Sequence, residues 1–133
     1  MRHGDISGGV QSTPISGRKF TDLDGMIIYN IAFSPHSYTG VMVALDKATG
    51  DVIWEYKMDD YTWSSPVAVY TPEGKGYIVI CDSVGNVKLI DGATGTFIDS
   101  VNIGSNVEAS PAVFEDKFVV GTKGGMIYGV KIK

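Results

Sequence analysis

The sequence predicts an all-β fold built from repeated antiparallel units, and three observations support this prediction. A motif of the form apolar-Asp-x-Ala-Thr-Gly occurs twice, with its aspartates at Asp46 and Asp91, 45 residues apart. A Ser-Pro element recurs at the same spacing, at Pro66 and Pro111. The 133 residues also include 17 glycines, and glycine is the residue of tight turns. We therefore expect many turns and few long helices.

The repeated motifs divide the chain into three units of one kind. The first unit is expected at about 10–58, the second at 62–103 and the third at 107–133, which stops before its own copy of the aspartate motif. Residues 1–7 are expected to be the end of a preceding or a closing strand. We treat the whole chain as a single domain, because self-similarity at a fixed period indicates a repeat architecture.

Within the middle unit, the sequence pattern predicts four short strands separated by turns. Short runs rich in β-branched and aromatic residues, bounded by Gly and Asp, favour strands over helices. No segment of about 11 residues shows an apolar period of 3.6. The four strands are expected at Val67–Tyr70, Tyr77–Cys81, Asn86–Ile90 and Thr96–Val101.

A four-stranded antiparallel meander that repeats every 40 to 45 residues, roughly, is the unit of a β-propeller blade. The chain holds about two and a half to three such blades, whereas a closed ring needs at least about four. The sequence therefore predicts a partial β-propeller. We expect it to be completed by strand exchange between copies or by the missing part of a longer parent chain, of which this would be a C-terminal piece. The expected partners are accordingly the remainder of the parent chain or a second copy.

One stretch carries a more specific pattern. Residues 44–54 read A-x-D-x-x-x-G-x-x-x-W, with Ala44, Asp46, Gly50 and Trp54 at the fixed positions. This resembles the tryptophan-docking motif of PQQ-like repeat propellers, which include the pyrroloquinoline quinone (PQQ) dehydrogenases and the outer-membrane assembly scaffold lipoprotein and are akin to WD40 and YVTN propellers. The resemblance implies that Trp54 packs between neighbouring blades. It also implies that Asp46 and Gly50 shape the turn between the third and fourth strands, and that Ala44 is a small packing position.

The second unit departs from this pattern. It keeps Asp91 and Gly95, but Leu89 replaces the alanine and Asp99 stands where the motif has tryptophan. The resemblance therefore implies a docking motif that is complete in the first unit and incomplete in the second.

Bulk composition narrows the classes of partner. The formal net charge is −4, and no cluster of Lys and Arg stands out, so nucleic acid is not expected as a partner. No run approaches the roughly 18 apolar residues of a membrane span, so membrane insertion is not expected. The single cysteine, Cys81, excludes an internal disulfide and is interpreted as a buried thiol. We expect an extracytoplasmic location, periplasmic or at the cell surface, if the parent carries a signal peptide, and a cytoplasmic location otherwise.

No residue combination in the sequence predicts a catalytic or metal site. Residues 22–25 fail the calcium-loop pattern and are interpreted as a hairpin loop. Neither His3 nor His36 has a neighbour at metal-ligand spacing. The serines beside the prolines recur with the repeat and are interpreted as architectural, since no nucleophile motif accompanies them. The pair Asp59-Asp60 is interpreted as solvated linker charge.

Two aromatic residues are candidates for contact with a ligand or partner. Tyr61 and Trp63 precede the second Ser-Pro element, where exposed rings could stack a planar ligand or contact a peptide; packing between blades is the alternative.

We predict a non-catalytic binding or scaffold module for a protein or polymer. The alternatives are a blade segment of a PQQ-dependent dehydrogenase and the sensor domain of a larger surface protein. No cofactor is expected in this chain, and PQQ and calcium would apply only to an enzyme parent.

Overall fold

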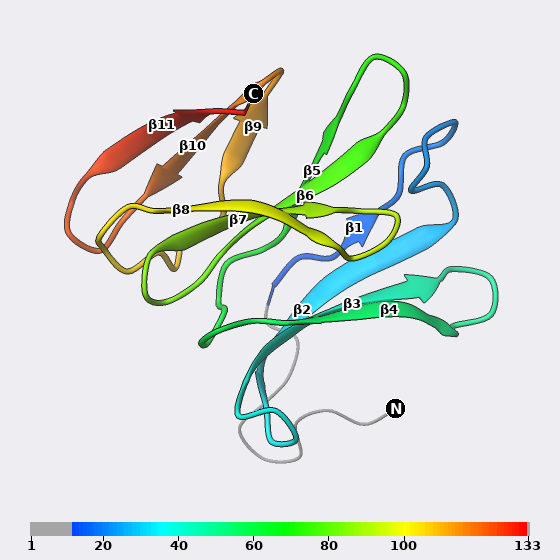
Figure 1. Ribbon diagram of the computed structural model, residues 1–133, viewed down its shortest axis with the longest axis horizontal. Helices are drawn as coiled ribbons and strands as arrows, with labels where there is room; N and C mark the ends of the chain where they lie inside the picture. Colours follow the sequence, from blue (N-terminus) through cyan, green and yellow to red (C-terminus); the bar gives the residue numbers. More distant parts are fainter. Residues whose placement is uncertain (1–11, 133) are drawn as a thin grey trace.

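A computed structural model describes residues 12–132, which form eleven strands and no helix. The strands make three antiparallel sheets that fan out side by side (Figure 1). No helix long and apolar enough to cross a membrane is present in this part of the chain. The predicted all-β class is confirmed.

Each sheet is a meander whose strands follow one another in chain order. The first sheet contains β1 (Ile15–Ser16), β2 (Met26–Ser34), β3 (Thr39–Asp46) and β4 (Val52–Lys57). The second sheet contains β5 (Val67–Tyr70), β6 (Gly76–Cys81), β7 (Asn86–Asp91) and β8 (Phe97–Asn102). The third sheet contains β9 (Ala112–Phe114), β10 (Lys117–Gly121) and β11 (Ile127–Lys131). The strands of the second sheet lie within a residue of their expected positions.

Proline marks the same place in all three sheets. Pro14, Pro66 and Pro111 each stand immediately before the first strand, which is β1, β5 or β9. Because proline lacks a backbone N–H, it is tolerated at the start of a strand and on an edge. The three sheets therefore begin alike, and the 45-residue spacing of Pro66 and Pro111 matches the starts of the second and third sheets.

Two hydrophobic cores join the sheets. The core between the first and second sheets includes Leu23, Ile28, Met42, Trp54, Ile78, Ile80 and Ile90. The core between the second and third sheets includes Val79, Cys81, Val87, Val107, Phe118 and Val120. Each apolar side chain buried in this way contributes about 1.5–3 kcal/mol relative to exposure, so the stacking of sheets is a main source of stability.

The first two sheets share a β-bulge at the same point. The pairing of β3 with β4 shifts between Ala44 and Leu45, and the pairing of β7 with β8 shifts between Leu89 and Ile90. A bulge bends its strand and increases the local twist. The fourth strands of both sheets are therefore bent alike.

The third sheet has three strands, with β11 at its edge. Sheets of four, four and three strands make a partial β-propeller, as predicted. The expected strand at residues 1–7 lies outside the described residues.

Candidate functional site

The indole of Trp54 lies between the first and second sheets. Its Nε1 donates a 3.0 Å hydrogen bond to the carbonyl oxygen of Gly92, and the side chain is only 8% exposed. The ring also covers Gly95, where an added Cβ would come within 2.6 Å of a ring carbon. Ala44, which pairs with Trp54 across β3 and β4, is fully buried beside it. A side chain of one sheet thus contacts the backbone of a turn in the next.

The turn between β3 and β4 is held by a carboxylate. Asp46 Oδ1 accepts hydrogen bonds of 2.8 and 2.9 Å from the backbone N–H groups of Ala48 and Thr49. These bonds, that of Thr49 above all, lower the pKa of Asp46 because they favour its charged form. Gly50 closes the turn with a φ of 75°, a left-handed conformation that glycine adopts readily.

The turn between β7 and β8 is a copy of the first. Asp91 Oδ1 accepts from the N–H groups of Ala93 and Thr94 at 3.0 and 3.2 Å, and Gly95 has a φ of 72°. Burial alone would raise the pKa of Asp91, but Lys75, 3.2 Å away, and the two N–H donors outweigh it, so this pKa is lowered. Both turns present the same backbone shape, and the Trp54 ring covers the second.

A loop of the first sheet also reaches the second sheet. Leu23, fully buried, fits against Gly76 and Gly92, where an added Cβ would come within 2.6 and 2.7 Å of its methyl carbons. Asp22 Oδ1 accepts a 2.7 Å hydrogen bond from the Gly76 N–H. The sequence predicts a hairpin loop here but not this contact, since the loop has no copy in the other units.

A buried cation lies in the same interface. The side chain of Lys88 on β7 is 4% exposed, forms an ion pair with Asp59 and lies 5.5 Å from the ring centre of Tyr56. Burial would lower the pKa of Lys88, but Asp59 and Tyr56 reverse this and raise it. The Asp59 side chain is 72% exposed, as expected of a solvated linker charge, but the sequence does not predict its partner Lys88. The sequence does carry a signal for this ion pair. A lysine that alternates with apolar residues in a strand indicates a buried cation, which needs an acidic partner.

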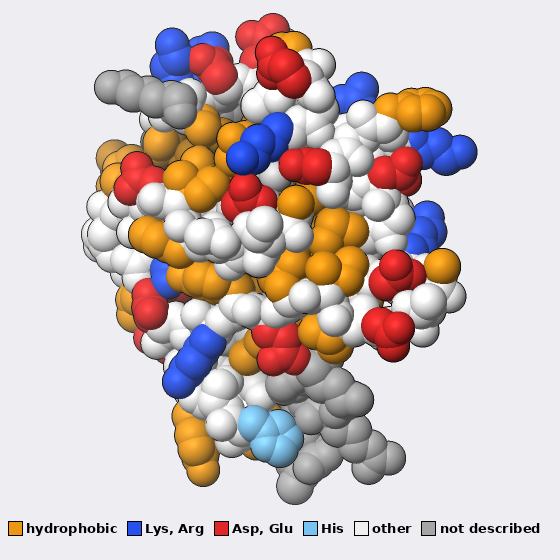
Figure 2. Space-filling view, turned by 45° about the vertical axis from the view of Figure 1, so that its right-hand side comes forward, with side chains coloured by type: hydrophobic (Ala, Val, Ile, Leu, Met, Phe, Trp, Pro, Cys, Tyr) orange, Lys and Arg blue, Asp and Glu red, His pale blue; other side chains and the backbone are white. Residues whose placement is uncertain are grey.

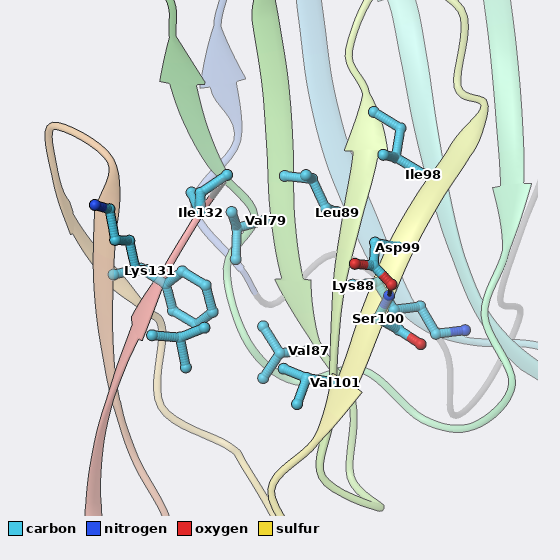
Figure 3. Close-up of a pocket in the computed structure, with 12 residues that line it drawn as sticks. Val79, Val87, Lys88, Leu89, Ile98, Asp99, Ser100, Val101, Lys131 and Ile132 are labelled. Carbon is cyan, nitrogen blue, oxygen red and sulfur yellow. Dashed lines mark hydrogen bonds between the residues drawn. The ribbon is translucent and has the colours of Figure 1, made fainter.

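The interface between the second and third sheets differs from the first. Asp99 occupies the position in β8 that Trp54 occupies in β4, so β8 places no indole between the second and third sheets. A cavity of about 300 Å³ lies at this point. Figure 3 shows Leu89 between Ile132, on the side of the third sheet, and Ile98 on β8.

A larger cavity continues the first toward the turns. Its volume is about 1000 Å³, and the two cavities share Leu89, Ile98 and Ile132 as lining residues. Together they form one cleft between the second sheet (B) and the third sheet (C), which we call the B–C cleft. The larger part is also lined by Arg18, Val69, Tyr70, Thr71, Pro72, Lys75, Tyr77, Asp91, Thr94, Thr96, Glu115 and Asp116.

Aromatic rings and charges lie close together in this cleft. Arg18 lies 5.8 Å from the ring centre of Tyr70, and Lys75 lies 5.3 Å from that of Tyr77. Besides Lys88, whose side chain turns to the first sheet, three basic and four acidic residues line the two cavities. The cleft thus carries charges of both signs, and it combines apolar walls with polar groups as ligand sites do.

The two aromatic candidates lie elsewhere. Tyr61 is 43% exposed and its ring lies 5.2 Å from that of Phe33, while Trp63 is 37% exposed. Neither lines the B–C cleft. A role for Tyr61 and Trp63 in binding would therefore concern a separate surface at the linker between the first two sheets.

Charges are dispersed over the face shown in Figure 2, and residues 12–132 bring together no group of metal ligands. On the face shown in Figure 2, Lys and Arg side chains lie apart from one another among acidic ones. Among residues 12–132, no three His, Cys, Asp or Glu side chains come together as metal ligands.

Comparison with known proteins gives the same architecture. No family model matches the chain. The β-alanine-activating enzyme of Danio rerio is 23% identical over 99 residues, which are 72% of this chain and 8% of that protein.

Three solved structures align with nearly the whole chain. The quinohemoprotein alcohol dehydrogenase ADHIIG of Pseudomonas putida HK5 has a TM-score of 0.69 and 24% identity, covering 97% of this chain and 20% of its own. The β-propeller domain of Cps50 (Swd1) from Myceliophteria thermophila has a TM-score of 0.66 and 15% identity, covering 96% and 36%. BamB of Moraxella catarrhalis has a TM-score of 0.60 and 16% identity, covering 92% and 43%.

The chain spans less than half of each of these proteins. At these identities the likeness concerns the fold, and it agrees with the resemblance to PQQ-like propellers that the docking motif indicates. The protein consists of three consecutive blades of a β-propeller.

Proposed function

We propose that this chain is a non-catalytic binding module, in which propeller blades hold a segment of a partner protein in the B–C cleft. The observation that carries the proposal is the open, apolar cleft between the second and third sheets, in contrast to the filled interface between the first and second. Tyr70, Tyr77 and Leu89 supply apolar surface there, and concave sites with apolar walls and a few polar groups are typical of binding sites.

The neighbouring folds do not by themselves distinguish a binding role from a catalytic one. Propeller blades form BamB and the Cps50 (Swd1) domain as well as an alcohol dehydrogenase, and a fold by itself does not fix a function. The B–C cleft, and not the fold, is therefore the ground for a binding role. We propose that the remainder of the parent chain determines the cellular compartment in which this module lies.

Two matched residues allow a direct test. Ile98 and Ile53 are the extra residues of the equivalent bulges, and they are 44% and 45% exposed, but only Ile98 lines the B–C cleft. A photo-crosslinking amino acid placed at Ile98 should capture a defined protein in cells that make the full chain, whereas the same group at Ile53 should not. Binding of that purified partner should then be weakened by Ile98→Glu and unaffected by Ile53→Glu. Equal crosslinking at both sites, or equal binding by both variants, would overturn the proposal.

The fold likeness to the alcohol dehydrogenase favours a second candidate, in which these are blades of a quinone enzyme. Titration calorimetry of the full-length parent with calcium and PQQ separates the two. We expect no saturable heat that depends on the side chains of this chain. A saturable heat that variants in the B–C cleft abolish would favour the enzyme.

A further inference from the structure

We propose that Asp24 and Gly25 form a site of spontaneous chemical modification, at which the aspartate isomerises to isoaspartate. The same dipeptide occurs again at Asp91 and Gly92, and there the fold opposes the reaction. The modified site lies on the loop between β1 and β2, outside the B–C cleft, so it is independent of the proposed function.

The reaction needs only the two residues and water. The Gly25 nitrogen attacks Cγ of Asp24, a new C–N bond closes a succinimide ring, and the carboxyl OH leaves as water with the amide proton. A water molecule then opens the ring at one of its two carbonyl carbons. Opening at the main-chain carbonyl leaves the chain joined through Cγ, which is isoaspartate, and no atom is gained or lost overall. Glycine favours the attack because it has no Cβ to crowd its nitrogen.

The reacting groups of the first dipeptide are accessible. Asp24 and Gly25 are both exposed, and an added Cβ at Gly25 would meet no atom within 4 Å. Among the described residues, no oxygen accepts a hydrogen bond from the Gly25 N–H. The attacking nitrogen is therefore not held by a partner, and the surrounding chain leaves room for the ring.

The Asp24 carboxylate is held weakly. Among residues 12–132 its one hydrogen bond comes from the Phe20 N–H, 3.3 Å from Oδ2, which is beyond the usual range of about 2.7–3.2 Å. Phe20 is itself strained, since its φ of 63° is unfavourable for a bulky residue, and its side chain is 94% exposed. Breaking this bond therefore costs little, and the carboxyl group is free to turn toward the Gly25 nitrogen.

The second dipeptide carries restraints that the first lacks. The Gly92 N–H donates a 3.0 Å hydrogen bond to the Gly76 carbonyl, and Gly92 is buried against Leu23, which an added Cβ would approach within 2.7 Å. The Asp91 carboxylate accepts from two backbone N–H groups and pairs with Lys75 at 3.2 Å. Both reacting groups must be released before the ring can close, which requires local opening of the interface between the first two sheets.

Isomerisation at Asp24 would act on that same interface. Isoaspartate adds one carbon to the main chain immediately after Leu23, which is fully buried against the second sheet. On the other side, the Gly25 carbonyl accepts a 2.7 Å hydrogen bond from the Lys47 N–H. A longer main chain between these two fixed points displaces one of them. The loop should therefore loosen from the second sheet as the chain ages.

Peptide mapping of the folded chain, stored at physiological temperature and neutral pH, tests the proposal. One trypsin digest reports both dipeptides, because it releases residues 20–47 and residues 89–117 as separate peptides. Isoaspartate is recognised as a second chromatographic form of equal mass and is located by electron-transfer fragmentation. It should accumulate at Asp24 at least about tenfold faster than at Asp91, because local structure protects only the second site. The comparison needs no variant, so it does not depend on whether a variant folds.

The chain unfolded in guanidinium chloride is the matched control. Both dipeptides lose their surroundings there, and their rates should become similar, with Asp91 accelerated far more than Asp24. The variant Asp24→Glu supplies a second control, because its longer side chain would have to close a less favourable ring. After equal storage, the urea midpoint of the unmodified chain should fall as isoaspartate accumulates, while that of Asp24→Glu should stay constant.

Three results would overturn the proposal. Equal accumulation at Asp24 and Asp91 in the folded chain would show that the contacts of Gly92 give no protection. Absence of isoaspartate at Asp24 in the folded chain, under conditions where the unfolded chain reacts, would show that the loop holds the two groups apart. An unchanged urea midpoint in a chain fully converted at Asp24 would show that the loop does not depend on this linkage.

Discussion

The backbone N–H of Ser65 donates a 3.0 Å hydrogen bond to Oγ of Ser110, the residue 45 positions later that holds the same place in the next sheet. The N–H of Thr13 donates in the same way to Oγ of Ser65, at 2.9 Å. All three residues precede the proline before a first strand. Hydroxyl groups at this point therefore join successive sheets, which gives the recurring serine a structural role.

Replacing Trp54 by alanine should destabilise the protein by about 3–5 kcal/mol, because a buried ring and its hydrogen bond to Gly92 are lost. We propose on this basis that Trp54 is the docking residue of the first blade. The free energy of unfolding from urea denaturation measures the effect. Trp63→Ala is the matched control, and its loss should be much smaller because this ring is 37% exposed. A loss near zero for Trp54→Ala would contradict the docking role.

Two equivalent glycines separate the cost of backbone strain from the cost of the docking contact. Gly50→Ala should cost about 1–2 kcal/mol, because alanine is strained at a φ of 75° while its Cβ meets no atom within 4 Å. Gly95→Ala has the same strain, but its Cβ would collide with the Trp54 ring, which should add about 1–3 kcal/mol. Urea denaturation of both variants gives the difference. Equal losses would show that the ring moves aside freely.

The carboxylates of the two turns should make stability fall in acid. The pKa values of Asp46 and Asp91 are lowered from 3.8 by folding, so their stabilisation is present above pH 3.8 and is lost as the pH falls through the folded values. Urea denaturation between about pH 5 and pH 2 should show a smaller decrease for Asp46→Asn than for the unmodified protein. Asp51→Asn is the control, since its carboxylate has no hydrogen bond among the described residues. If Asp51→Asn alters the acid dependence of stability as much as Asp46→Asn does, the role assigned to the Asp46 carboxylate is wrong.

The thiol of Cys81 should report on opening of the interface between the second and third sheets. Burial raises its pKa to about 12, and the side chain belongs to the core between these sheets. Since the thiolate is the reactive form, Ellman's reagent at about pH 8 should react with the native protein far more slowly than with protein unfolded in urea. Equal rates would show that this core is open in solution.

Much of the fold could be predicted from the sequence, because the same unit occurs more than once along the chain. The spacing of Pro66 and Pro111 defined the repeat, and the strands of the second sheet follow from turn residues and β-rich runs. The copies of Asp46 and Asp91 indicated that two turns share one shape. Local patterns that recur are thus enough to predict the sheets and their order.

The contacts between sheets were harder to predict. Leu23 reaches the second sheet from a loop that has no copy elsewhere, and the pairing of Lys88 with Asp59 joins residues from different units. The B–C cleft depends on the place of Asp99 relative to the next sheet. Such contacts depend on how the units stack, and neither periodicity nor turn chemistry encodes that stacking directly.

The two interfaces between neighbouring sheets differ in their contacts, and this difference has a mechanical consequence. The first two sheets are fastened by the Trp54 indole, by Asp22 on Gly76 and by the Lys88 ion pair, whereas the third adjoins a cleft. In a stack where each unit touches only its neighbours, the weakest joint yields first. Under mechanical force or on heating, the third sheet should separate from the second at the interface beside β8. The first and second sheets should stay together.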